Sequence, residues 1–159
     1  MKKLLILLCV LAMLLSLPGV ASASPPEPGQ FTITGYTTSY DWEPLPSGLT
    51  KFHLTAAGLV TGYFAGTFTF EEWGIVDLNP ITGEGSGRGT NHGLMTVTTD
   101  AGEVFTRFGG QTDSQTVWGN FTVLHGTGDH KDLHGQGTYT GNAGLVFLVV
   151  FTGRFHSKP

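Results

Sequence analysis

Apolar and polar residues alternate with a period of two through most of the chain after residue 30. The longest such run spans 63–78, with Phe64, Phe68 and Phe70 on one face of the expected strand and mainly threonines on the other. This period is typical of a β-strand that buries one face. Outside the first 23 residues, no useful length of chain carries apolar residues at the helical spacing i, i+3, i+4. The chain is therefore predicted to be all-β.

Short segments rich in Gly, Asp, Asn, Ser and Pro separate the alternating runs. About eight strands are predicted, at residues 30–40, 51–61, 63–78, 90–99, 103–111, 116–125, 134–140 and 145–156. Their connections are not crossover helices, so we expect antiparallel pairing. A closed antiparallel β-barrel of about eight strands is the predicted fold, because the 24 glycines suit strongly bent strands. A β-sandwich of two sheets is the alternative.

The first 23 residues have the three parts of a secretory signal peptide. Lys2 and Lys3 precede an uncharged apolar run over 4–17, and small residues end at Ala23, where we expect cleavage. The apolar run is shorter than the roughly 20 residues of a membrane-spanning helix. Cys9, the one cysteine, lies in this signal. We therefore expect a secreted or extracytoplasmic protein with no disulfide, and no membrane span after cleavage.

The remaining chain divides into a lead-in and a domain. Residues 24–29 hold three prolines and are expected to be solvated and unpaired, and residues 30–157 are expected to form the barrel. Without Lys2 and Lys3, the basic residues fall from 8 to 6 against 12 acidic ones, a net charge of 6 − 12 = −6. A domain this acidic lacks the positive surface that nucleic acids require. Nucleic acid is therefore excluded as a partner, and anionic membrane surfaces are disfavoured.

The last predicted strand is apolar on both faces. Phe147, Val149 and Phe151 lie on one face, and Val146 and Leu148 lie on the other. A barrel strand whose outer face meets water has only one apolar face. The outer face is therefore expected to be covered, either by a loop or the N-terminal segment, or by another copy of the chain in a homo-oligomer.

Two segments joined by a glycine-rich connection resemble a known family. Residues 123–129 (VLHGTGD) and 133–138 (LHGQGT) are similar to a segment of the allene oxide cyclase and dirigent-like β-barrel superfamily, especially its secreted bacterial members. Residues 151–156 (FTGRFH) and 62–68 (GYFAGTF) resemble strands of the same superfamily. The resemblance implies a closed eight-stranded antiparallel barrel, often a trimer. Named members of the superfamily hold a reactive lipid or phenolic intermediate inside the barrel, where its folded conformation controls the stereochemistry of the product. The matching residues form the scaffold, so they carry over no catalytic residue.

Three histidines and two aspartates gather around the same connection. His125, His130 and His134 lie near Asp129 and Asp132, and these residue types suit zinc. The glycines around them equally suit a solvated turn in which Asp129 accepts backbone hydrogen bonds. We favour the turn and predict neither a metal site nor a cofactor.

Glu72 is the candidate catalytic residue. If the alternation of Phe68 and Phe70 continues, Glu72 points into the barrel, where a carboxyl group could act as a general acid or base. A bulge, or the end of the strand at the barrel rim, would instead place Glu71 and Glu72 in water. Six further residues in strands are candidate ligand contacts: Phe68, Phe70, Trp73, His92, Arg107 and Tyr139.

These observations leave three functions open. The first is a secreted barrel that binds a small, largely apolar molecule without turnover. The second is a cyclase or isomerase of the allene oxide cyclase type. The third is a structural or envelope-associated barrel whose interior is packed. Only the first two require a cavity.

Overall fold

The structure is a computed structural model, and it describes residues 25–157. The expected signal peptide, its cleavage point after Ala23 and Cys9 lie outside the described residues. Within the described part of the chain, no helix is long and apolar enough to cross a membrane.

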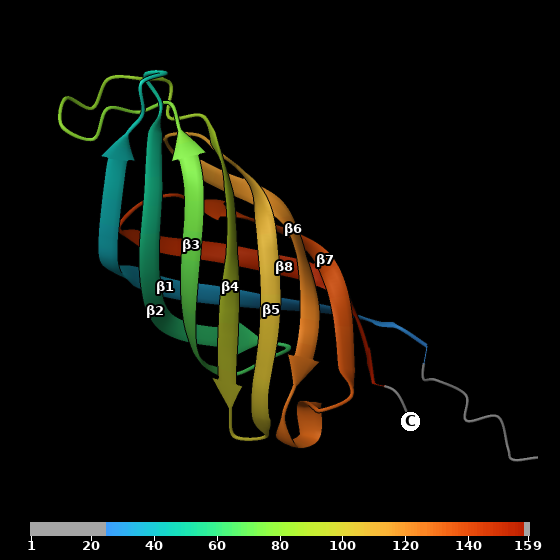
Figure 1. Ribbon diagram of the computed structural model, residues 1–159. Coiled ribbons are helices and arrows are strands. Elements are labelled where there is room, and N and C mark those ends of the chain that lie inside the picture. The colour runs from blue at the N-terminus through green and yellow to red at the C-terminus, as the bar shows by residue number, and fades with distance from the viewer. Residues whose placement is uncertain (1–24, 158–159) are drawn as a thin grey trace, which may run out of the picture.

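Eight antiparallel strands close into a barrel (Figure 1). Each strand pairs with its neighbours in sequence, and β1 closes the barrel by pairing with β8. The predicted all-β fold and closed antiparallel barrel are confirmed, and the sandwich alternative is wrong. The strands are β1 (Glu27–Pro44), β2 (Thr50–Gly62), β3 (Gly66–Val76), β4 (Gly89–Thr99), β5 (Gly102–Thr112), β6 (Thr116–Gly126), β7 (Leu133–Asn142) and β8 (Val146–Ser157).

Strand β1 is longer at both ends than the alternation predicted. It begins at Glu27 inside the expected lead-in, and it continues through the expected loop to Pro44. Pro28 faces Arg154 of β8 without breaking the pairing. Two residues later, the carbonyl of Gln30 points toward the β2 side, where it accepts from the backbone N–H of Tyr63. In a strand, residues two apart direct their backbone groups to the same side, so the nitrogen of Pro28 also faces the β2 side. Because β2 ends before this point, no hydrogen bond is lost there.

One end of the barrel is filled by aromatic side chains. Phe31 stacks on Phe151 at 4.7 Å between ring centroids, and Phe31, Phe64, Phe121 and Phe155 are each at most 3% exposed. The short 3₁₀ helix η1 (Gly128–His130) lies at this end, beside the β4–β5 turn (Figure 1). We call this filled half the closed end.

The opposite end carries the β1–β2, β3–β4, β5–β6 and β7–β8 connections. A β-bulge in β1, between Thr37 and Ser39, changes which residues face inward. Before the bulge, Ile33 and Gly35 are buried; after it, Tyr40 lines the interior. The hydroxyls of Thr38 and Ser39 bond to that of Thr55 at 2.7 and 2.8 Å. The bulge therefore places a tyrosine at this end that the regular alternation would direct outward.

The outer face of β8 is exposed among the described residues. Val146 is 72% and Leu148 is 46% exposed, whereas the alternating residues Phe147 and Val149 are buried. Tyr36 of β1 lies opposite Val146 and is 56% exposed. Within residues 25–157, no loop covers this face. A loop cover is therefore wrong for the described chain, while cover by the N-terminal segment or by a second copy stays a prediction.

Candidate functional site

A cavity of about 320 Å³ occupies the half of the barrel opposite the closed end. Its walls are the inner faces of the strands, and its rim includes Leu78, Asp113 and Ala143 from three connections at that end. The volume lies in the range of small-molecule sites, roughly 300–1,000 Å³. The interior is thus filled at one end and hollow at the other.

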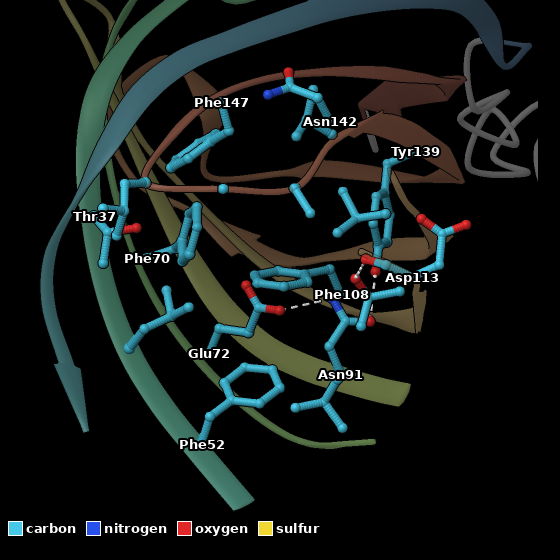
Figure 2. A pocket seen from close by; sticks show the side chains of 18 of the residues that line it. Thr37, Phe52, Phe70, Glu72, Asn91, Phe108, Asp113, Tyr139, Asn142 and Phe147 are labelled. Carbon is cyan, nitrogen blue, oxygen red and sulfur yellow. Dashed lines mark hydrogen bonds between the residues drawn. The ribbon is translucent and has the colours of Figure 1, made fainter. Parts of the chain in front are cut away.

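Five phenylalanine rings line the cavity, and Figure 2 labels four of them, with Phe151 of β8 as the fifth. Phe70 of β3 lies 5.6 Å from Phe108 of β5 and 5.4 Å from Phe147 of β8, measured between ring centroids. Phe52 of β2 also lines the cavity. These rings are close enough to hold one another in edge-to-face and tilted arrangements. They present an apolar, aromatic surface to a molecule in the cavity.

Two inward-facing glycines make room for two of these rings. A Cβ atom on Gly74 would lie 2.5 Å from the Phe52 ring, and one on Gly93 would lie 2.4 Å from the Phe108 ring. Both distances are far below van der Waals contact. The rings therefore lie against bare backbone, which keeps them out of the centre of the barrel.

A connected polar group interrupts the apolar wall. Asn91 of β4 donates from Nδ2 to Oε1 of Glu72 on β3 over 2.8 Å, and the Tyr139 hydroxyl of β7 donates to Oδ1 of Asn91 over 3.2 Å. Asn91 and Tyr139 are 6% and 4% exposed. Each buried polar group thus has a partner, which offsets much of the cost of removing it from water. In the described chain, Asn91 is the one hydrogen-bond donor found for the Glu72 carboxyl group.

The surroundings change the acidity of these groups. Burial raises the pKa of Glu72 to about 7, although the Asn91 hydrogen bond acts in the opposite direction. Burial also raises the pKa of Tyr139 to about 12, with a smaller contribution from the nearby Glu72 charge. Tyr40 shows a raised pKa for the same two reasons. Near neutral pH, the Glu72 carboxyl group is therefore present in both its protonated and its ionised form, whereas the Tyr40 and Tyr139 hydroxyls stay protonated.

Asp113, in the β5–β6 turn, is a second carboxyl group on the cavity lining. Its Oδ1 accepts from the backbone N–H groups of Gln115 and Thr116 at 2.9 and 2.7 Å, and from the Thr116 hydroxyl at 2.9 Å. These hydrogen bonds, that of the Gln115 N–H first, lower the pKa of Asp113. Asp113 is thus a fixed negative charge at the rim near neutral pH.

The inward orientation of Glu72 agrees with the alternation of Phe68 and Phe70. Phe70, Glu72 and Tyr139 all line the cavity. Phe68 is 2% exposed and stacks against Phe70 at 5.7 Å, so it supports the wall from the filled side. Four of the seven candidate residues therefore belong to the wall or its support.

Trp73, His92 and Arg107 do not line the cavity. Trp73 and His92 follow inward-facing neighbours, so the period of two directs them outward, where their rings stack at 5.9 Å. His53 stacks on the other face of Trp73 at 5.3 Å. Arg107 lies exposed between the buried Thr106 and Phe108. Their expected place in the ligand site is not what the structure shows.

Several cavity residues were not singled out from the sequence. Asn91 lies an even number of residues from the apolar Met95 and Val97, so the alternation places it on the same inner face. Asparagine is depleted in strands, so an asparagine at such a position indicates a site residue that the sequence could have revealed. Phe52 and Phe108 were equally detectable by parity. Tyr40 was not, because the bulge at Thr38 precedes it.

The three histidines around the connection from β6 to β7 go to separate partners. His130 bonds through Nε2 to the Thr99 hydroxyl at 3.1 Å. His125 stacks on Phe105 at 4.4 Å, and His134 stacks on His156 at 5.5 Å. Among residues 25–157, no group of three or more His, Cys, Asp or Glu side chains is placed to hold a metal ion.

Fold and site together define a class of protein: a closed eight-stranded antiparallel barrel with an aromatic cavity at one end. No family model matches the sequence, and the search of curated proteins found no match. A solved structure described as a pyocyanin demethylase is similar, with 12% sequence identity and a TM-score of 0.47 over 78% of this chain and 98% of that one. The closed barrel implied by the resemblance to the allene oxide cyclase and dirigent-like superfamily is present. Membership of that superfamily stays a hypothesis.

Proposed function

We propose that this chain is an exported barrel protein that binds a small, largely apolar molecule in its cavity. The observation that carries the proposal is the cavity itself, lined by five phenylalanine rings and by the hydrogen-bonded polar group at Glu72. A mostly apolar hollow with a few convergent polar atoms is the usual form of a small-molecule site. A barrel with a solid interior does not fit a hollow of about 320 Å³.

Export and self-association belong to the same proposal. The signal-like first 23 residues support export with cleavage after Ala23. The exposed Val146 and Leu148 on β8, next to Tyr36, support burial of this face between copies. The local resemblance to secreted barrels of the allene oxide cyclase and dirigent-like superfamily supports both.

The binding proposal is tested by filling the cavity. Leu54 lines it from β2, and Leu59 on the same strand points outward with 62% of its surface exposed. Leu54→Trp is expected to weaken binding of the fluorescent probe N-phenyl-1-naphthylamine at least about tenfold, because the indole occupies the space of the ligand. Leu59→Trp is the matched control and should bind as the parent does. Equal probe binding by the Leu54→Trp protein would place the probe elsewhere and contradict the proposal.

Isomerisation or cyclisation of the bound molecule is the second candidate function. The favouring observation is a carboxyl group with a pKa of about 7 in the cavity, with one oxygen held by Asn91. Such a group can take and return a proton at neutral pH. The test is deuterium uptake from heavy water into molecules that copurify with the protein from its host, measured by mass spectrometry. Uptake should disappear in Glu72→Gln, and no uptake in the parent protein counts against catalysis.

A further inference from the structure

The cavity lining carries acidic groups without any basic group. Two of its side chains are carboxylic acids, Glu72 within the barrel and Asp113 at the rim, whereas no Lys, Arg or His lines it. A carboxylate surrounded by apolar groups normally has a cationic partner, since an unpaired buried charge is costly. On this lining the described chain supplies none; Arg88, whose charge helps to lower the pKa of Asp113, lies outside the lining. A ligand that ends in a carboxylate or phosphate would meet only like charge in this cavity.

Two of the polar groups beside Glu72, Asn91 and Tyr139, are hydrogen-bonded. Both ends of the Asn91 amide are engaged, one with Glu72 and one with Tyr139. These bonds leave the second carboxyl oxygen of Glu72 for a ligand, and Figure 2 shows the carboxyl group directed into the space lined by Phe70 and Phe108. The acceptor that remains is thus aimed at the region where a ligand would lie.

We propose that the cavity takes a hydrophobic amine, with its protonated nitrogen on the Glu72 carboxylate and its apolar body among the phenylalanine rings. The inference rests on the proposed function, because it names the chemical class of molecule for the same cavity. The nitrogen donates N–H bonds to the free oxygen of Glu72. Aromatic ring faces also attract cations, which adds to the preference for an amine.

Charge at the rim and over the whole chain favours the same class. Asp113 stays ionised through its three hydrogen bonds, with a smaller contribution from the Arg88 charge, and it would attract a cation approaching the opening to the extent that Arg88 leaves its charge unbalanced. After removal of the signal the chain has a net charge of 6 − 12 = −6. A negative field of this kind raises the rate at which cations arrive and lowers that of anions.

Proton binding to Glu72 makes amine binding depend on pH. The titratable or charged groups that share its surroundings are Tyr40 from β1, Tyr139 from β7 and Asp113 from the β5–β6 turn, and none of them is a cation. In the empty cavity the pKa of Glu72 is about 7. An ammonium group beside it lowers that pKa, so the amine should bind more tightly as pH rises through 7.

The experiment compares three naphthalene probes of similar size by isothermal titration calorimetry at pH 8. The probes are 1-naphthylmethylamine, which is a cation, 1-naphthalenemethanol, which is neutral, and 1-naphthoate, which is an anion. The amine is expected to bind at least about tenfold more tightly than the alcohol, and the anion more weakly than both. Between pH 8 and pH 5.5 the amine should lose most of this advantage.

The matched variants are Glu72→Gln and Glu71→Gln, neighbouring residues on β3 with opposite orientations. Glu71 lies outside and pairs with His53 Nε2 at 2.8 Å. Glu72→Gln keeps an acceptor for Asn91 and should bind the alcohol as before, while its affinity for the amine falls to that of the alcohol. Glu71→Gln should keep the amine preference. If the parent binds the alcohol as well as the amine, the inference is overturned and the proposed function stands. If none of the probes binds, both are overturned.

Discussion

Asn91 holds Oε1 of Glu72 from the neighbouring strand, two residues away from the direct partner of Glu72 in the β3–β4 register. Gly93 occupies that direct position, and it carries no side chain toward the carboxyl group. The carboxyl group is therefore oriented by a diagonal amide, and the space above Gly93 is left to the Phe108 ring. Orientation of the acid and room for the ring come from the same pair of strands.

Replacing Asn91 by leucine should destabilise the protein. Two buried groups, Oε1 of Glu72 and the Tyr139 hydroxyl, would lose their partner at once. An unsatisfied buried group costs roughly 1–3 kcal/mol, so we expect about 2–4 kcal/mol in the free energy of unfolding by urea denaturation. The pKa of Glu72 should also rise, because the Asn91 hydrogen bond lowers it. Asn120→Leu, on the outer face of β6, is the control, and an equal loss there would contradict this account.

The contribution of Glu72 to the free energy of unfolding should fall as pH rises from about 4.5 to about 7. The pKa of Glu72 is raised from 4.5 to about 7, so the folded chain binds more protons than the unfolded chain between these values. The stabilisation is complete below the unfolded pKa and is lost as pH passes the folded pKa. One pKa unit is worth about 1.4 kcal/mol, so the loss is on the order of 3 kcal/mol.

The measurement is urea denaturation of the parent, Glu72→Gln and Glu71→Gln proteins at several pH values in this window. Glu72→Gln should lack this component of the slope, and Glu71→Gln should retain it, since Glu71 lies outside the barrel. Parallel slopes for the parent and Glu72→Gln would show that the raised pKa does not govern the pH dependence.

The two ends of the barrel should respond differently to loss of a ring. Phe155 at the closed end is 1% exposed and contacts the rings of Phe64 and Phe121. Phe155→Ala should cost about 3–5 kcal/mol of unfolding free energy, measured by denaturation. Phe70 borders an existing cavity and is only partly buried. Phe70→Ala should cost clearly less in stability and more in probe affinity; the reverse order would mean that the hollow is not a binding site.

Alternation along the sequence was sufficient to predict the barrel and the inward position of Glu72. The period of two records which face of a strand is buried, and β3 keeps it without interruption from Phe68 to Val76. The same rule, applied strictly, would have directed Trp73 and His92 outward and Asn91 inward. The residue types of Trp73 and His92 suit a ligand site, but their places in the alternation put them on the outer face.

Other parts of the site could not be obtained from alternation. The bulge at Thr38 shifts the parity of β1, and nothing in its threonines and serine distinguishes a bulge from a regular strand. The pairing of Pro28 with β8 depends on β2 ending early, which is a property of the closed barrel. The contact of Tyr139 with Asn91 joins residues 48 positions apart, so it requires the barrel to be closed first.

Gly74 offers the sharpest test of how the cavity is kept open. A Cβ atom at Gly74 would lie 2.5 Å from the Phe52 ring and 2.3 Å from the backbone oxygen of Thr90. Gly74→Ala should therefore displace the ring toward the cavity, lower the unfolding free energy by about 1–3 kcal/mol and weaken probe binding. Gly109→Ala is the matched control, because its Cβ atom would meet nothing closer than 3.4 Å. Denaturation and probe titration of both variants check the prediction, and a Gly74→Ala protein with parental affinity would show that the Phe52 ring does not limit the cavity.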